Sequence, residues 1–405
     1  MTRSPSPLAG PSTAAALVLA AAALSASPAA AQDSVRPVPD PVRPPPGYRG
    51  AAEAGTRSAD GSPGPAYWQQ DASYQIEATL TTEGGPTLHG SARILYRNRS
   101  PDTLEVLHLH LHQNLHAPGA VRNEAQEVTG GATLGRVAVD GTELSALGEA
   151  EGGAGGADAD AAPGYGVEAT VLALRPAAPV APGDSARVEV DWRFRVPRSG
   201  AGRMGWSEDL FFLAYWYPQM AVYDDVVGWH TDPYLGRAEF YMGFADYDVR
   251  LTLPEGWVVR ATGTLENPSD VLPADVRERL RRADGSDTVV HVLGADDIGP
   301  GAATVDAPDD QLTWRFTASD VRDFAFSATR RSRWDAARAP VGDRDGDGAE
   351  DHTRVEALWR SSAPLWDDVW RYSQHAIDFL SRYTDLPYPW PHMTAVEGGG
   401  IIGGG

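Results

Sequence analysis

The sequence predicts a mainly β protein: a saddle-like β-sandwich followed by the first helix and strand of an α/β domain that the sequence leaves unfinished. Alternating apolar and polar residues recur in short runs through most of the chain, and Gly and Pro residues separate these runs. Only one long stretch, near the carboxyl end, has the apolar spacing of a helix. These observations indicate sheets first and a helix late.

Residues 1–31 have the features of a secretory signal peptide. Arg3 precedes an apolar stretch of about 11 residues from Ala14 to Leu24, and small residues precede Gln32. A membrane-spanning helix needs roughly 20 apolar residues. We therefore expect cleavage after Ala31, no transmembrane segment afterwards, and an exported protein, periplasmic or extracellular. Residues 32–66 are rich in Pro and Gly without apolar periodicity, so we expect a flexible spacer.

The composition excludes several function classes. The formal net charge is −21, and an acidic protein repels phosphate backbones, so no nucleic-acid partner is expected. The chain has no Cys, which excludes disulfides, thiolate metal sites and thiol nucleophiles. Every one of its 34 basic residues is Arg, so a Schiff-base lysine and a phosphate-binding P-loop are excluded as well.

Residues 67–335 carry the strand pattern of the expected β-sandwich. Tyr74–Thr82 and Leu88–Asn98 alternate and are joined by a Gly-Gly turn, which predicts an antiparallel pair. A low-complexity insertion, 148–164, is expected to be a mobile loop. The other alternating runs are Thr103–Leu115, Ala186–Val196, Tyr247–Gly263, Asp287–Leu293 and Leu312–Thr329.

Residues 352–405 predict the start of a second domain. Between Ser361 and Leu386 one apolar stripe recurs at spacings of three and four, which predicts a helix. The prolines at 387, 389 and 391 end it, and His392–Glu397 follows as a short strand. The stripe consists of Leu365, Val369, Tyr372, Ala376, Phe379, Leu380 and Tyr383.

An acidic insertion is expected at 336–351, and it contains a candidate calcium site. Asp343, Asp345 and Asp347 occupy positions 1, 3 and 5 of a calcium loop, and Asp351 falls at position 9. Arg354 stands where an EF-hand has its bidentate Glu. The alternative interpretation is a hydrophilic acidic turn.

Two other clusters admit a chemical interpretation. His108, His110 and His112 share one face of a predicted strand, which would suit a zinc ion but also a solvated strand face. The aromatic segment from Phe211 to Pro254 contains carboxylates and a histidine that suggest acid/base hydrolysis, or aromatic packing with loop carboxylates. These residues are Asp224, Asp225, His230, Asp232 and Glu239.

Several ordered blocks of the sequence resemble the amino-terminal region of the aminopeptidase N family of zinc metallopeptidases. The blocks are "YQIEATL", "LHGSARILYRNRSPDTLEVLHLHLHQN", "YWYPQMAVYDDVVGWHTDPYLGRAEFYMGFADYDVRLTLPEGWVVRATG", "FAFSATRRSRWD" and "YTDLPYPWPHMTAVEGGG". The resemblance implies a β domain followed by a thermolysin-like catalytic domain. It also implies that Met393–Val396 is the edge strand of that domain, and that Gly404 and Gly405 are the glycines of a substrate-binding loop.

The same resemblance implies a zinc ion and a peptide or protein substrate. H-E-x-x-H is absent from the sequence, as are G-x-S-x-G and a G-x-G-x-x-G after a strand. We therefore expect a truncated sequence, zinc ligands beyond Gly405, and no catalysis by the 405 residues alone. Tyr217 stands near the place where many relatives have the Glu that grips the substrate's amine, so exopeptidase specificity is an open question, as is the oligomeric state.

Three hypotheses follow. The first is the amino-terminal part of an exported zinc metallopeptidase. The second is a secreted β-sandwich binding module, for which glycans are a candidate ligand. The third is a carboxylate-dependent hydrolase that uses the region from Asp224 to Glu239.

Overall fold

The computed structural model describes residues 43–82, 84–147, 162–237 and 241–400. The predicted signal peptide, most of the low-complexity insertion, Glu239 and the glycines Gly404 and Gly405 therefore lie outside the described residues. The chain divides into two units, 1–45 and 46–405, and every element described below belongs to the second. In the described part of the chain, no helix has the length and apolar character needed to cross a bilayer.

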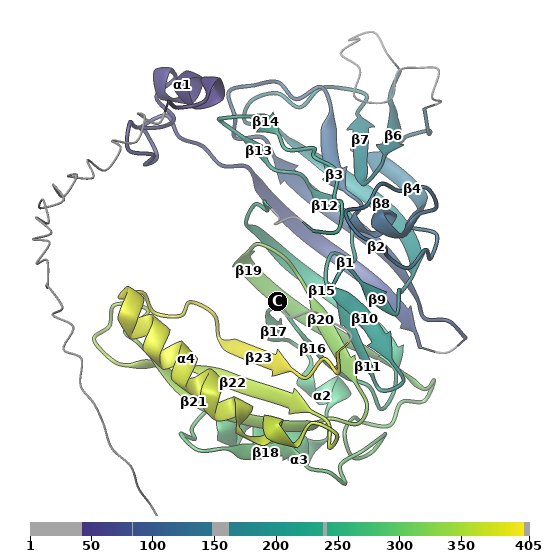
Figure 1. Ribbon diagram of the computed structural model, residues 1–405, viewed down its shortest axis with the longest axis vertical. Helices are drawn as coiled ribbons and strands as arrows, with labels where there is room; N and C mark the ends of the chain where they lie inside the picture. Colours follow the sequence, from purple (N-terminus) through teal and green to yellow (C-terminus); the bar gives the residue numbers. More distant parts are fainter. Residues whose placement is uncertain (1–42, 83, 148–161, 238–240, 401–405) are drawn as a thin grey trace, which may run out of the picture. The chain divides into compact units, whose positions relative to one another are not determined.

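The largest sheet has eight strands, and most of the predicted alternating runs lie in it (Figure 1). Its neighbours pair antiparallel except β1 and β15, which are parallel. In order across the sheet, the strands are β17 (Thr264–Leu265), β19 (Gln311–Val321), β15 (Ala245–Pro254), β1 (Asp71–Thr81), β2 (Thr87–Arg97), β8 (Ser185–Arg195), β4 (Thr133–Val139) and β5 (Thr142–Glu143).

Three smaller sheets complete the β region. The first contains β16 (Val258–Ala261), β20 (Phe326–Thr329), β11 (Leu210–Leu213), β10 (Met204–Ser207) and β9 (Ser199–Gly200). The second contains β12 (Gln219–Met220), β3 (Leu107–His110), β7 (Val171–Arg175) and β6 (Gly164–Glu168). The third is the pair β13 (Tyr223–Asp224) and β14 (Gly228–Trp229).

One hydrophobic core joins these sheets. Alternate residues of β1, β2 and β8 are buried, as the period of two requires for strands with one face inward. Trp216 and Phe324 are fully buried in the same core. The prediction of a mainly β fold is thus confirmed.

A fourth small sheet contains the last strands of the described chain. Its strands are β18 (Val290–Leu293), β21 (Arg333–Gly342), β22 (Asp351–Trp359) and β23 (His392–Val396). Helix α4 (Val369–Thr384), preceded by the 3-10 turn η3 (Pro364–Asp368), packs on β21 and β22 (Figure 1). Two further helices, α2 (Pro268–Val271) and α3 (Ala274–Ala283), precede this sheet in the chain.

The expected boundary at 335 and the expected insertion at 336–351 differ from the structure. Strand β21 runs without a break through residue 335, and Ala337, Ala339 and Val341 are buried in the small core under α4. Ala336, Ala337 and Ala339 are not the β-branched or aromatic residues typical of strands, so this segment has a weak strand signal in the sequence. Only the acidic turn between β21 and β22 is an exposed loop.

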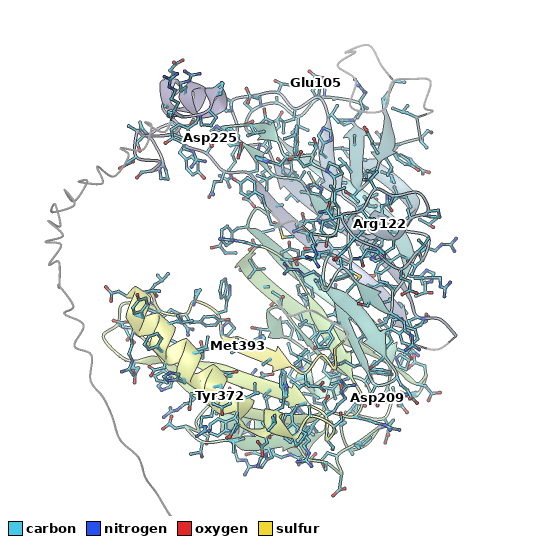
Figure 2. The ribbon with its side chains drawn as sticks, in the orientation of Figure 1. Glu105, Arg122, Asp209, Asp225, Tyr372 and Met393 are labelled. Atoms are coloured by element: carbon cyan, nitrogen blue, oxygen red, sulfur yellow. The ribbon has the colours of Figure 1, made fainter. Side chains whose placement is uncertain are left out.

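Helix α4 confirms the predicted helix but not the role of its apolar stripe. Buried positions on α4 are Ser373, Ile377 and Ser381. The stripe lies on the other side: the large residues Leu365, Tyr372, Phe379, Leu380 and Tyr383 are between 52% and 87% exposed. Figure 2 labels Tyr372 on this helix. The small sheet accepts small side chains from α4, so the larger apolar face has no partner among the described residues.

The expected spacer also contains ordered structure. Residues 46–66 form α1 (Pro46–Glu53) and a compact turn in which Ala51 and Thr56 are buried. The Thr56 N–H donates to the Ala51 carbonyl (3.0 Å), and the Gly64 N–H donates to the Thr56 carbonyl (2.8 Å). Pro and Gly here supply tight turns rather than a flexible chain. The run expected as a strand at 103–115 is likewise shorter, because β3 ends at His110 and the 3-10 turn η1 (His112–His116) follows.

Candidate functional site

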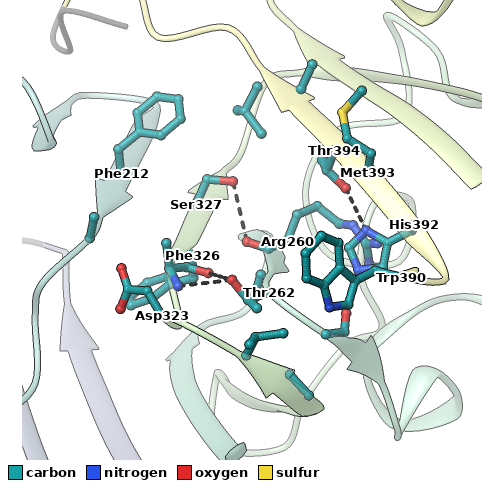
Figure 3. A pocket seen from close by; sticks show the side chains of 18 of the residues that line it. Phe212, Arg260, Thr262, Asp323, Phe326, Ser327, Trp390, His392, Met393 and Thr394 are labelled. Carbon is teal, nitrogen blue, oxygen red and sulfur yellow. Dashed lines mark hydrogen bonds between the residues drawn. The ribbon is translucent and has the colours of Figure 1, made fainter. Parts of the chain in front are cut away.

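A cleft of about 1460 Å³ separates β23 from the strands of the β region (Figure 3). One wall is the segment from Tyr388 to Gly400, which contains β23. The opposite wall comes from β16, β19 and β20 and from the residues around Tyr215. A cavity of this size between two folded parts is the usual setting of a binding site.

Asp323 is the carboxylate of the β wall. Its Oδ1 accepts hydrogen bonds from the Tyr217 hydroxyl (2.9 Å) and from the Phe324 N–H (2.8 Å). Tyr217 is itself buried and lies 3.0 Å, oxygen to oxygen, from the Tyr247 hydroxyl. Burial raises the pKa of Asp323 to about 6, although both hydrogen bonds oppose the rise. Tyr217 thus holds a carboxylate that lies just beyond the end of β19. This is the tyrosine near whose position the sequence resemblance implies a Glu.

A buried ion pair fixes the floor of the cleft. Arg260 on β16 and Glu356 on β22 approach to 2.7 Å between Nε and Oε2, and both side chains are almost fully buried. Arg354 adds a second contact to Glu356, also of 2.7 Å. Burial alone would raise the pKa of Glu356, but Arg260 and Arg354 outweigh it and lower the pKa to about 2. The pair therefore connects the β region to the small sheet through an ionised Glu356 whose negative charge is balanced by arginine.

His392 ties the start of β23 to the same floor. Its Nε2 donates to the Gly263 carbonyl (2.5 Å), and its Nδ1 lies 3.1 Å from the Thr394 hydroxyl (Figure 3). Burial, aided by nearby Arg260, lowers the pKa of His392, so the ring is neutral at pH 7. A neutral imidazole that donates from Nε2 leaves Nδ1 as an acceptor. The contact orients β23 without adding charge.

Strand β23 has one free edge within the described part of the chain. It pairs in parallel with β22 and is the last strand of its sheet. The Pro391 carbonyl and the Glu397 N–H bond to β22, and bonds in a parallel ladder fall on alternate residues. The N–H and C=O groups of Thr394 and Val396 therefore face the free edge, and both residues line the cleft. The prediction of an edge strand at 393–396 is confirmed.

The predicted calcium residues lie away from the cleft, in the turn between β21 and β22. Carboxylate oxygens of Asp343, Asp345 and Asp351 come within 4.8 Å of one another. Asp347 is not part of this group; its Oδ1 accepts the Ala349 N–H at 2.8 Å. Three of the four predicted ligands are thus brought together. Calcium binding itself stays a prediction.

The histidine run is a packing feature rather than a solvated face. His108 contacts the Trp229 ring edge-on at 5.3 Å, and His110 stacks on His112 at 5.3 Å. Burial lowers the pKa of His108 to about 4. Among the described residues, Asp343, Asp345 and Asp351 form the one group of three or more His, Asp or Glu side chains close enough to share a metal ion. His108, His110 and His112 therefore do not belong to any such group within the described chain.

The carboxylates of the aromatic segment hold the local backbone together. Asp224 accepts from the Val226 and Val227 N–H groups and contacts His230 Nε2 at 2.9 Å. Asp225 receives two hydrogen bonds from Arg57, at 2.8 and 2.7 Å. Asp232 lies near His110 instead, where its charge opposes the lowering of that histidine's pKa. Glu239 lies outside the described residues. The contacts of Asp224 and Asp225 favour the interpretation as aromatic packing with loop carboxylates.

Comparison with solved structures finds similarity to the M1 zinc metallopeptidase of Deinococcus radiodurans. The first match, to a variant of that enzyme, has 12% identity and a TM-score of 0.43, and covers 83% of this chain and 58% of the other. The unmodified enzyme matches with 13% identity and a TM-score of 0.42, over 82% of this chain and 57% of the other. A further structure of the variant, described as bound to a Tyr-Ser-Ala substrate, matches with 13% identity and a TM-score of 0.42, over 83% and 58%.

This chain is similar to part of these M1 zinc metallopeptidase chains. It spans a little under three-fifths of the length of these solved chains. No family model matches the sequence. No curated protein matches it either.

Sequence reasoning missed the residues that build the cleft. Arg260 and Glu356 lie 96 residues apart, and Asp323 and Tyr217 lie 106 apart. Charged residues inside otherwise apolar strands were the available signal: Arg260 follows two valines, and Glu356 interrupts "VEALW". A charged residue within an apolar strand is expected to be buried and to have a partner of opposite charge, but the sequence does not say which residue that partner is.

Proposed function

We propose that this chain is the amino-terminal, substrate-binding part of an exported zinc metallopeptidase. The observation that carries the proposal is the free edge of β23 along the large cleft. Unpaired N–H and C=O groups on an edge strand bind an extended peptide by adding it as a further strand. Export is supported by the leader sequence at residues 1–31.

The described residues do not fit a zinc site. Zinc in metallopeptidases takes histidine nitrogens together with a carboxylate, and the one candidate metal group among the described residues consists of carboxylates alone. None of the three carboxylates in that group lines the cleft. We therefore assign no catalytic step to the described residues, and we propose that the zinc ligands belong to polypeptide that follows Gly405.

The uncovered face of α4 supports the same proposal. Its large apolar side chains are exposed among the described residues. Proteins in water rarely leave a large apolar patch exposed, so such a patch usually contacts another polypeptide or a ligand. Additional chain packed on Tyr372, Phe379 and Tyr383 would complete the second domain. H-E-x-x-H within about the next hundred codons is the expected finding, and an in-frame stop directly after codon 405 would oppose it.

Peptide binding at β23 can be tested on the chain itself with Tyr-Ser-Ala as the probe and saturation-transfer NMR as the readout. Thr394→Pro removes an N–H that faces the free edge and leaves the ladder to β22 in place. Thr394→Val is the matched control, because it removes the hydroxyl but keeps that N–H. We expect the proline variant to bind at least tenfold more weakly and the valine variant to bind as the parent does.

Equal binding by Thr394→Pro and the parent would contradict the edge-strand proposal. Hydrolysis of the probe by the purified 405-residue chain in excess chelator would instead support the carboxylate-dependent alternative.

A further inference from the structure

A second cavity, of about 310 Å³, lies beside the large cleft and has a different chemical character. It is bounded by the segment that leads into β1, by β2, and by the residues around β13. Its volume is at the lower end of the range for small-molecule sites, roughly 300–1,000 Å³. We refer to it as the aromatic pocket. Phe244 and Arg322 line both cavities.

Aromatic rings form much of its wall. Trp68 stacks on Tyr223 with ring centroids 5.7 Å apart, and both line the pocket. Tyr241 and Phe244, which also line it, are 54% and 41% exposed. Exposed aromatic side chains at a cavity gain from a ligand that removes their faces from water. The wall therefore suits a ring-shaped ligand with an apolar face.

The Tyr96 hydroxyl is the decisive feature of the pocket. Tyr96 lies on β2, is 2% exposed and packs its ring on Trp229 at 5.9 Å. Within the described residues, no atom forms a hydrogen bond with its hydroxyl, although the residue lines the pocket. A buried hydroxyl without a partner destabilises the folded protein, and a phenylalanine would fill the same space without that cost. A ligand that supplies the missing hydrogen bond would explain the tyrosine.

The charges of the pocket oppose an ionic ligand. Three carboxylates and a single guanidinium, that of Arg322, line it, and the excess of carboxylates disfavours an anion. Arginines neutralise two of them, and the third, Asp224, is already engaged by the Val226 and Val227 N–H groups and by His230, which leaves little for a cation to bind. The pairs are Asp71 with Arg97 and Arg99, Asp224 with His230, and Asp225 with Arg57. Carboxylate oxygens accept more than one hydrogen bond, so they can still bind hydroxyl groups.

We propose that the aromatic pocket binds a neutral carbohydrate whose C–H face packs on the exposed rings and one of whose hydroxyls bonds to Tyr96. Pyranose rings combine an apolar face with several hydroxyls, which matches aromatic walls bordered by amides and paired carboxylates. An aromatic ligand would use the rings but leave most polar groups of the wall unmatched. This binding site is additional to peptide binding at β23 and does not depend on it.

The test uses saturation-transfer NMR on the 405-residue chain with D-glucose, D-galactose, D-mannose and N-acetyl-D-glucosamine as probes. Indole, tetramethylammonium and inorganic phosphate represent aromatic, cationic and anionic ligands. We expect saturable binding of at least one sugar and weaker signals from the other three classes. Tyr96→Phe should weaken that binding about five- to tenfold, as expected for one lost hydrogen bond, and Phe244→Ala should weaken it as well.

Thermal unfolding separates a binding role from a structural one. Because the Tyr96 hydroxyl has no partner among the described residues, Tyr96→Phe should leave the unfolding midpoint unchanged or raise it while it weakens sugar binding. Tyr372→Ala, on the exposed face of α4, is the control and should bind sugar as the parent does. The proposal is overturned if no sugar binds saturably, if Tyr96→Phe and Phe244→Ala both leave binding unchanged, or if phosphate, tetramethylammonium or indole binds in preference.

Discussion

Arg260 on β16 and Glu356 on β22 form an ion pair closed to solvent, with exposed fractions of 2% and 0%. The guanidinium also lies over the Trp334 ring, 5.1 Å from its centroid. The pair connects two sheets that have no strand in common. It places the ionised Glu356 beside Thr394 of β23, the strand that we propose binds peptide.

Glu356→Gln should destabilise the protein strongly. The amide leaves the buried Arg260 without its counter-charge, and breaking a buried pair in this way costs about 3–5 kcal/mol. Because Glu356 has a folded-state pKa of about 2, its stabilising effect is complete above the unfolded-state pKa and is lost as pH falls toward 2. Denaturant unfolding at several pH values measures both effects. Glu278→Gln, in an exposed pair with Arg281 on α3, should cost less than about 1 kcal/mol.

Asp323→Asn should have the opposite pH dependence. The folded-state pKa of Asp323 is about 6, so between about pH 4 and 6 the folded protein holds a proton that the unfolded chain has released. Ionisation of Asp323 therefore reduces stability as pH rises through this window. Relative to the parent, the asparagine variant should gain about 2 kcal/mol in unfolding free energy between pH 4.5 and 7.5. The exposed Asp320→Asn is the control, and an equal gain there would refute the assignment.

The two faces of α4 should respond differently to truncation. Ile377 is buried in the small core, so Ile377→Ala should cost about 2–4 kcal/mol through lost burial and the cavity left behind. Phe379 is 52% exposed, and Phe379→Ala should change stability by no more than about 1 kcal/mol. Urea unfolding of both variants checks this difference. A larger loss from Phe379→Ala would mean that the apolar face is already covered within this chain.

Millimolar calcium should raise the thermal unfolding midpoint if the acidic turn binds the ion in the folded state. At 100 times the dissociation constant the gain is about 2.7 kcal/mol. Asp345→Asn should abolish the shift, because Asp345 belongs to the group of three carboxylates. Asp347→Asn, two residues away and outside that group, should retain most of it. An unchanged midpoint at millimolar calcium in the parent removes the calcium prediction.

Local patterns in the sequence predicted the strands well. Alternation over 74–82 and 88–98 closely matches β1 and β2, because one face of each strand is buried and the period of two is preserved. The short strand β23 was also predicted, after the proline-rich segment that follows the helix. These features depend only on neighbours in sequence.

Long-range pairing could not be predicted in the same way. Periodicity identified the apolar stripe of α4 but not which face meets the sheet, since the sheet beneath it is built from small residues and accepts Ser373 and Ser381. The Pro- and Gly-rich residues before β1 read as spacer, because the Arg57 contact that fixes them is with Asp225, 168 residues away. Asp323, Arg260 and Tyr96 acquire their roles only through such contacts.

The continuity of β21 through residue 335 determines where this protein can be divided. A polypeptide shortened to end at Asp335 would retain three residues of β21, lose the pairing of Ala336 with Val290, and remove Glu356 from beside Arg260. Proteases should accordingly cleave the acidic turn near Gly346 in preference to any site at that junction. A cloning boundary therefore belongs after the small sheet, because the main hydrophobic core continues into this sheet through Trp334, Ala336 and Leu358.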